Sequence, residues 1–243
     1  NFLATAAVRI RGANLSLSPD RAVANQRMWV FGTGFTPVST GRSGAPVSVY
    51  QITGKDDSVL SLDGVALRSP HVEYPIDLRP NGNLYALVDI PTTPATTQAG
   101  RVEMRVTDSE GRSGVTNLTI QGQAAYLTPL SAYPSETTLV VGWGFRASNT
   151  SLNISNHVDL TYTYEAGEIG KTGEAYHRSV DLGRAQVDSE GRFSAEFTIP
   201  AGAKIPSTNS VIITPRSGDA LTVAHKVPGP SLSVQPNRAF NND

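Results

Sequence analysis

The sequence predicts an all-β fold built from tandem β-sandwiches, and three observations lead to this prediction. A set of sequence landmarks recurs with a spacing close to half the 243-residue chain. Short runs rich in Val, Ile, Thr and Tyr alternate between apolar and polar residues. Turns rich in Gly, Asn and Asp separate these runs.

The landmarks keep nearly the same spacing along the whole repeat. A Leu-x-Pro opening ends at Pro19 and again at Pro129, 110 residues later, and a related opening ends at Pro236. A Val-x-Gly-x-Gly-Phe run occupies residues 30–35 and 140–145. An Ile-Pro pair closes a short alternating run at 90–91 and at 199–200. These equal offsets indicate a repeated structural unit of about 110 residues.

Within each unit the apolar residues follow a period of two, which indicates strands with one buried face. The clearest runs are Val102-Met104-Val106, Leu84-Ala86-Val88 and Phe193-Ala195-Phe197-Ile199. Asn81-Gly82 and Glu190-Gly191 supply residues that turn a hairpin. Six to eight short strands in about 110 residues are typical of an immunoglobulin-like sandwich, here without cysteines.

The landmarks also predict the domain organisation. We expect two complete immunoglobulin-like repeats at 13–122 and 123–229, with Gly or Pro at the junctions. Residues 4–10 match the closing strands of both repeats, so 1–12 is expected to be the last strand of a preceding repeat. By the same alignment, 230–243 is expected to be the first strand of a following repeat. Strand donation to a neighbouring molecule is an alternative for these terminal strands.

The repeat resembles the tandem immunoglobulin-like modules of bacterial cell-surface proteins, of the kind called IPT/TIG-like. The matching motifs are the Leu-x-Pro opening, the Val-x-Gly-x-Gly-Phe run, the hairpin from Asp188 to Pro200 and the closing run at 106–112. They cover essentially the whole chain, although segments 36–70 and 146–180 diverge between the repeats. The resemblance implies a stalk, surface-layer or adhesin component outside the cell, and it implies no catalytic residue.

Composition excludes several other classes. A formal net charge of −1 gives no bulk attraction to nucleic acid. The absence of Cys excludes a disulfide scaffold, a zinc-thiolate site and a Cys nucleophile. No apolar stretch is long enough to span a membrane. The Gly32–Pro37 stretch lacks the third Gly and the following helix of a dinucleotide-binding loop.

The sequence offers few candidate sites. We expect no catalytic residue, no metal ligand and no cofactor, with calcium kept open as an alternative although no Asp-x-Asp-x-Asp frame is present. The four lysines do not recur at equivalent positions, so a lysine–asparagine crosslink is not indicated. The candidates for glycosylation are the four Asn-x-Ser/Thr sequons, at Asn14, Asn117, Asn149 and Asn153.

The most distinctive stretch is 162–178, where Tyr and Thr alternate on either side of a Gly-rich turn. It predicts a long hairpin, and Tyr162, Tyr164, Tyr176 and His177 are its candidate contact residues because Tyr is common at binding surfaces. In the favoured interpretation, however, the tyrosines cover their own sandwich.

The function expected from the sequence is structural: a non-enzymatic extracellular repeat protein in a prokaryotic surface filament, sheath, surface layer or adhesin stalk. Its expected partners are other copies of itself or neighbouring surface proteins, with no nucleic acid and no membrane insertion in this segment. Two alternatives stay open. One is a carbohydrate- or protein-binding module that uses the 146–180 loop region, and the other is an accessory β-region of a larger secreted enzyme.

Overall fold

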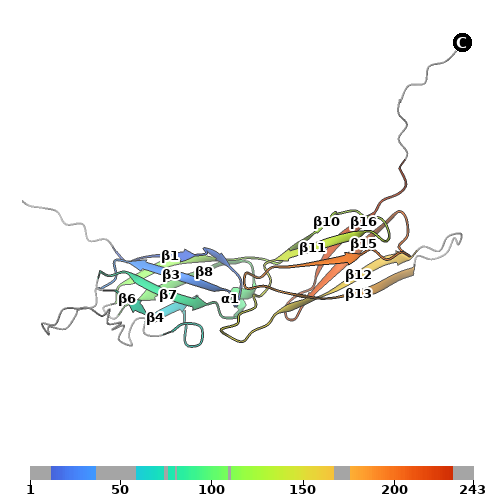
Figure 1. Ribbon diagram of the computed structural model, residues 1–243. Helices are drawn as coiled ribbons and strands as arrows, with labels where there is room; N and C mark the ends of the chain where they lie inside the picture. Colours follow the sequence, from blue (N-terminus) through green and yellow to red (C-terminus); the bar gives the residue numbers. More distant parts are fainter. Residues whose placement is uncertain are drawn as a thin grey trace, which may run out of the picture. The chain divides into compact units, whose positions relative to one another are not determined.

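A computed structural model describes residues 12–36, 59–73, 76–79, 81–108, 111–166 and 176–231 of the chain (Figure 1). The chain forms two compact units. Unit 1 comprises Asn1–Gln123, Trp143–Asn156 and Val187–Arg192, and unit 2 comprises Ala124–Gly142, His157–Gln186 and Phe193–Asp243. The strand predicted at 4–10 lies outside the described residues, and so do residues 232–243 of the strand predicted at 230–243.

Unit 1 contains two sheets. The four-stranded sheet has the order β1-β3-β7-β6, and the five-stranded sheet has the order β2-β9-β8-β4-β5. The strands are β1 (Asn14–Ser18), β2 (Arg21–Ala22), β3 (Arg27–Thr33), β4 (Val59–Leu62), β5 (Val65–Ala66), β6 (Asp77–Leu78), β7 (Leu84–Asp89), β8 (Gly100–Thr107) and β9 (Ser113–Ile120). One short helix, α1 (Pro94–Thr97), precedes β8.

The strands of unit 1 alternate between the core and the surface, as the sequence pattern predicts. Along β3, Met28 and Val30 are buried while Arg27 and Trp29 are exposed. The predicted stripes on β7 and β8, among them Val88 and Val106, lie in the same core cluster. Burying these side chains from both sheets supplies the main favourable term in folding, because apolar area leaves water.

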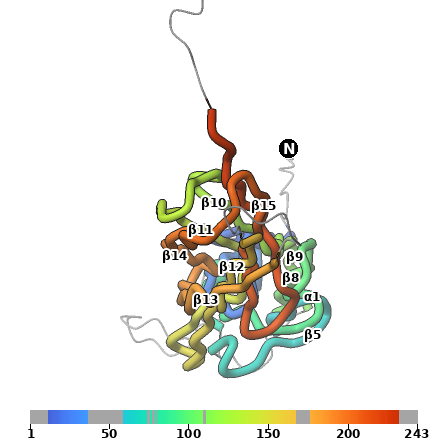
Figure 2. Tube along the Cα trace, turned by 90° about the vertical axis from the view of Figure 1, so that its right-hand side faces the viewer, coloured from blue at the N-terminus to red at the C-terminus, as the bar shows by residue number. Residues whose placement is uncertain are grey.

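Unit 2 repeats the plan with different strand lengths. Its three-stranded sheet has the order β10-β11-β14 and its four-stranded sheet the order β13-β12-β15-β16. The strands are β10 (Ala124–Thr128), β11 (Thr137–Trp143), β12 (His157–Ala166), β13 (Tyr176–Gln186), β14 (Phe193–Thr198), β15 (Ser207–Pro215) and β16 (Leu221–Val227). β12 and β13 form the long antiparallel pair that the sequence predicts around 162–178 (Figure 2).

The strand orders confirm the predicted fold class, tandem immunoglobulin-like β-sandwiches. In unit 1 the first sheet has the A-B-E-D order of immunoglobulin domains, and the second contains the C-F-G set. The short strand β2 pairs with β9 in parallel. In unit 2 an isolated parallel bridge from Ser131 to Lys226 occupies the corresponding place.

The repeated landmarks have the same local structure in both copies. Phe35 donates its backbone N–H to Gly82 O, and Phe145 donates to Gly191 O. Both glycines have positive φ, 78° and 77°, and a Cβ at either position would collide with the carbonyl oxygen of the phenylalanine. Only glycine fits such a position without strain, which explains why the predicted turn keeps it in both repeats.

Candidate functional site

A cleft of about 740 Å³ lies in unit 1. Its lining residues are polar in type except for Pro19. They combine residues of the first repeat with two loops, 148–151 and 189–192, that belong to unit 1. The lining residues are Ser18, Pro19, Arg21, Gln26, Arg27, Gln121, Ser148, Asn149, Thr150, Ser151, Ser189, Glu190 and Arg192.

A buried carboxylate, Asp89 at the end of β7, organises this region. The residue is 3% exposed. Arg27 donates from Nε to Asp89 Oδ1 at 2.9 Å and from Nη2 to Oδ2 at 2.7 Å. Asn149 donates from Nδ2 to the same Oδ1 at 2.7 Å. Three hydrogen bonds from two side chains compensate this buried carboxylate for its lost hydration, because an unpaired charge there would be very costly.

Asn149 connects its loop to this carboxylate. Its Nδ2 also donates to the backbone oxygen of Asn25 at 2.7 Å, while its Oδ1 accepts from the backbone N–H of Ser151 and of Leu152. The neighbouring Ala147 N–H donates to Ala24 O at 2.9 Å. The loop is therefore attached to the rest of unit 1 by several hydrogen bonds that are buried or partly buried.

The cleft has a positive excess. Arg27 is paired with Asp89, whose hydrogen bond raises the pKa of the arginine above its ordinary value. Arg192 is paired with Glu190 at 3.4 Å. The third arginine, Arg21, is exposed and makes no ion pair with any residue in the described part of the chain. A ligand with anionic groups therefore meets an available cation here.

The arrangement is suited to hydrogen bonding. Amides, hydroxyls and guanidinium groups line the cleft, and Glu190 is its one carboxylate lining residue. These groups both donate and accept, so they can bind a ligand that carries many hydroxyl or carboxylate oxygens.

A second polar cluster lies inside unit 2 and was not expected from the sequence. Asn209 Oδ1 accepts from the Glu165 N–H, so its Nδ2 is the donor to Tyr162 Oη at 3.0 Å. The Tyr162 hydroxyl lies 2.8 Å from Nδ1 of His225, and the tautomer of the imidazole decides which of the two donates. The other ring nitrogen, Nε2, is buried and has no partner among the described residues.

Burial also changes the acid–base properties of this cluster. His225 and Tyr162 are both 0% exposed. Desolvation lowers the pKa of His225, because the charged imidazolium loses its hydration. Desolvation raises the pKa of Tyr162, an effect that the hydrogen bond from Asn209 opposes. Both groups are therefore neutral at pH 7.

The candidate contact residues of the hairpin lie in two different environments. Tyr162 and Tyr164 are buried, with their rings 5.8 Å apart, and Tyr162 also contacts Phe197. These two tyrosines belong to the core of unit 2. Tyr176 on β13 is 67% exposed and His177 is exposed too. The turn between the strands, 167–175, lies outside the described residues.

The four sequons also differ in accessibility. Asn14, Asn117 and Asn153 are exposed. Asn149 is buried, and its Nδ2, the atom that would carry a glycan, donates the two hydrogen bonds described above. The folded chain therefore has no room for a glycan on Asn149.

No group of three or more His, Cys, Asp or Glu side chains is placed to hold a metal ion in the described part of the chain. Within the same residues, no helix has the length and apolar character needed to cross a bilayer.

Sequence reasoning did not identify the residues around Asp89. Asn25, Arg27 and Asn149 reach this carboxylate or its surroundings from positions up to 124 residues apart. Asn25 has a positive φ of 69°, and Ser135 at the equivalent position of the second repeat has a φ of 72°. An Asn at a turn is the one local feature of the sequence that agrees with this backbone conformation. The side-chain partners themselves follow from the tertiary fold.

Comparisons with known proteins give no family assignment. No protein-family model matches the chain, and no curated protein matches it. Among solved structures, the D00-D0 domain of intimin is similar over 88% of this chain and 98% of that chain, at 13% identity and a TM-score of 0.26. Dimeric latent PorU from Porphyromonas gingivalis is similar over 86% of this chain, at 14% identity and a TM-score of 0.27.

The sporulation control protein Spo0M from Bacillus subtilis is similar over 45% of this chain, at 14% identity and a TM-score of 0.26. The chain spans 49% of the length of Spo0M and 19% of the length of PorU.

Proposed function

We propose that this chain is a structural segment of an extracellular repeat protein, in which immunoglobulin-like sandwiches in series build or space a prokaryotic surface assembly. Its role is mechanical: each sandwich folds around its own core, and successive repeats add length. No catalytic step is part of this proposal.

The observation that carries the proposal is the way in which the repeats are joined. Two segments of the second repeat, 143–156 and 187–192, belong to unit 1. The Asn149 side chain and the Ala147 N–H attach the first of these segments to residues of the first repeat. In an array built in this way, each compact unit would be completed by segments of the following repeat, which suits a load-bearing chain.

The location can be tested with antibodies raised against the folded chain. Immunogold labelling of intact cells of the source organism is expected to decorate the outer surface, with periodic label along any filament or sheath. Label found only after permeabilisation would overturn the proposal. A cytoplasmic protein of known abundance, labelled in parallel, controls for cell breakage.

The structural role can be tested separately from the location. Cells that lack the gene are expected to lose or disorder the surface assembly, and the wild-type gene is expected to restore it. An unchanged surface, seen by electron microscopy of cells in which the protein is absent, would contradict the structural role.

A further inference from the structure

The outward face of the β1-β3-β7-β6 sheet carries four large side chains in a continuous row. Trp29 and Phe31 come from β3, and their ring centroids are 6.1 Å apart. Tyr85 comes from β7 and meets Phe31 edge-on at 5.8 Å. Leu87 of β7 pairs with Trp29 across the strands. We call these four residues the aromatic strip.

The fold does not require the aromatic strip. Alternate residues of the same strands, such as Val30 and Val88, point inward and form the core. Trp29, by contrast, is 45% exposed and Leu87 is 36% exposed. A contiguous apolar row left in water has an unfavourable hydration free energy, and such patches commonly mark interaction sites.

The second repeat provides an internal comparison. In unit 2, β11 pairs with β14 in the same register in which β3 pairs with β7. The residues that match Trp29, Phe31, Tyr85 and Leu87 are Leu139, Val141, Ser194 and Glu196. The same backbone position therefore carries an aromatic strip in unit 1 and a mixed, partly charged surface in unit 2. Unit 2 therefore forms the same kind of sandwich without an aromatic strip.

The aromatic strip continues into the polar cleft. β1 places Ser16 opposite Phe31 and Ser18 opposite Trp29. Ser18 also lines the cleft, as does Arg27, two residues before Trp29 on β3. An extended ligand can therefore contact the aromatic rings and the polar groups of the cleft at the same time.

We propose that the aromatic strip and the adjoining cleft bind an acidic polysaccharide. One face of a pyranose ring presents C–H groups. Their hydrogens carry a small positive charge, which is attracted to the negative face of an aromatic ring. The ring hydroxyls require donors and acceptors close by, which Ser18, Gln26 and the 148–151 loop supply. This site lies on strands β3 and β7 as well as on the loops, and it goes beyond the structural role without depending on it.

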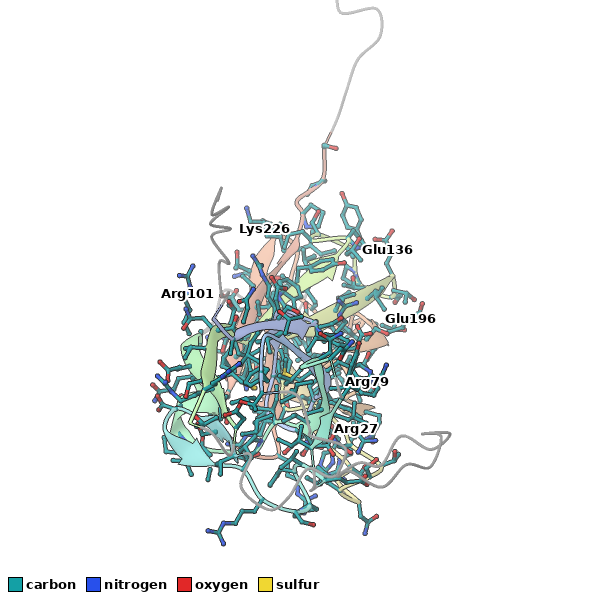
Figure 3. The ribbon with its side chains drawn as sticks, turned by 90° about the vertical axis from the view of Figure 1, so that its left-hand side faces the viewer. Arg27, Arg79, Arg101, Glu136, Glu196 and Lys226 are labelled. Atoms are coloured by element: carbon teal, nitrogen blue, oxygen red, sulfur yellow. The ribbon has the colours of Figure 1, made fainter. Side chains whose placement is uncertain are left out.

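The charges around the site favour an anionic chain. The Arg79 guanidinium lies over the Tyr85 ring at 4.1 Å, at one end of the aromatic strip. Arg21 contributes a cation at the cleft. Figure 3 shows Arg79 and Arg27 on the same side of unit 1, with Arg101 of the other sheet on the opposite side. A uronate carboxylate can pair with Arg21, so charge complementarity favours acidic over neutral sugars.

The same chemistry argues against two other occupants. Single-stranded nucleic acid also stacks on aromatic rings, but its binding depends on a basic groove that follows the phosphate backbone, whereas the cleft is lined mainly by amide and hydroxyl side chains that match sugar hydroxyls. A protein partner would place its anchoring side chains in apolar pockets, whereas the lining residues of the cleft, Pro19 apart, are polar in type.

The test is affinity electrophoresis of the whole chain through native gels that contain alginate, an acidic pyranose polymer. The wild type is expected to be retarded, and Trp29→Ala is expected to weaken retention by about tenfold. Trp29→Phe keeps a ring and is expected to keep most of the retention. Trp143→Phe, which alters the other tryptophan, is the matched control and is expected to bind as the wild type does. Arg21→Gln is expected to weaken retention and to make it less dependent on salt.

Thermal unfolding checks that each variant is folded; if Trp29→Ala is not, Leu87→Ser at an exposed position replaces it. Several results would overturn the proposal: no retardation by alginate, equal retention of Trp29→Ala, or equal retardation by neutral hydroxyethylcellulose. Tighter binding of oligo(dT) than of alginate would identify nucleic acid as the ligand instead. Self-association that is lost in Trp29→Ala, without alginate binding, would identify the aromatic strip as a contact between copies.

Discussion

The two units differ in which core positions carry polar side chains, although their equivalent strands pair in the same register. The positions occupied by Leu62, Val102 and Leu118 in the core of unit 1 correspond to Tyr162, Asn209 and His225 in unit 2. All six side chains are buried. The same place in the sandwich thus holds an apolar contact in one unit and a hydrogen-bonded cluster in the other.

The outward faces of the β1-β3-β7-β6 and β10-β11-β14 sheets differ as well. Unit 1 pairs Arg27 with Asp89 at one end of its aromatic strip, whereas the matching positions of unit 2 are Thr137 and Thr198. The inward positions common to both repeats, such as Val30 and Val140, keep the same apolar character. The comparison teaches that the shared core specifies the sandwich, while the outward residues of β3 and β7 are free to carry a function.

The largest expected effect tests the shared core. Ile90 and Ile199 are both 0% exposed and donate their backbone N–H groups to Gln26 O and Glu136 O. Ile90→Ala and Ile199→Ala are each expected to lower the free energy of unfolding by roughly 2–5 kcal/mol, because each leaves a cavity. Urea unfolding measures both variants. A loss below about 1 kcal/mol in either one would show that the two positions are not equivalent parts of the core.

The next effect concerns the loop attached through Asn149. Asn149→Ala removes both donors to Asp89 Oδ1 and Asn25 O, so the free energy of unfolding of unit 1 is expected to fall by about 1–3 kcal/mol. Hydrogen exchange is expected to accelerate at Ala147 and its neighbours. Asn117→Thr, on an exposed face of β9, is the control and is expected to be nearly neutral. Equal stabilities of the two variants would sink the role assigned to Asn149.

A smaller effect is expected on the pH dependence of stability, because the core of unit 2 contains His225 where the core of unit 1 contains Leu118. The pKa of His225 is lowered in the folded state, so below its ordinary value of 6.5 the unfolded chain binds more protons than the folded chain. The stability that neutral His225 contributes is therefore fully present above pH 6.5 and is lost as the pH falls below that value.

His225→Leu, which restores the residue type that unit 1 has at Leu118, is expected to remove this part of the acid sensitivity. Thermal unfolding between pH 7.5 and pH 5 measures the difference between the variant and the wild type. At pH 7 the variant is expected to differ little in stability, because it also removes the unpaired Nε2. Parallel pH profiles of the two proteins would contradict the assignment of the pH dependence to His225.

The smallest effect on stability is expected on the outward face of unit 2. Leu139→Trp, Val141→Phe, Ser194→Tyr and Glu196→Leu together copy the aromatic strip, and each is expected to change stability by about 0.5 kcal/mol or less because the sites are at least partly exposed. In a Trp29→Ala background this graft is expected to restore part of the retention by alginate. Retention no higher than that of Trp29→Ala itself would show that the strip does not suffice for binding.

The sequence predicted the parts of the structure that depend on local patterns. Alternation identified the buried stripes of β7 and β8, and the repeated glycines identified the turns at Gly82 and Gly191, where a Cβ cannot be accommodated. Tyr162 was recognised as unusual, but alternation does not reveal which face of a hairpin is buried. Its partners, Asn209 and His225, are 47 and 63 residues away.

The aromatic strip could not be predicted for a related reason. Trp29 and Phe31 fit a strand pattern whichever face they occupy, and their neighbour Tyr85 is brought beside them only by the pairing of β3 with β7. Asn149 carried a glycosylation signal in the sequence, whereas the fold uses its amide as a buried donor. Contacts of this kind become visible only when the register of the sheets is known.

The most direct test of the difference between the two faces uses the two tryptophans as separate reporters. In Trp143→Phe the remaining tryptophan fluorescence comes from Trp29, and in Trp29→Phe it comes from Trp143. Titration with alginate oligosaccharides is expected to shift the emission of Trp29 to shorter wavelength in a saturable manner, because stacking removes water from an indole that is now 45% exposed. The emission of Trp143 is expected to stay unchanged. No shift in Trp143→Phe, or the same shift in both variants, would contradict the account.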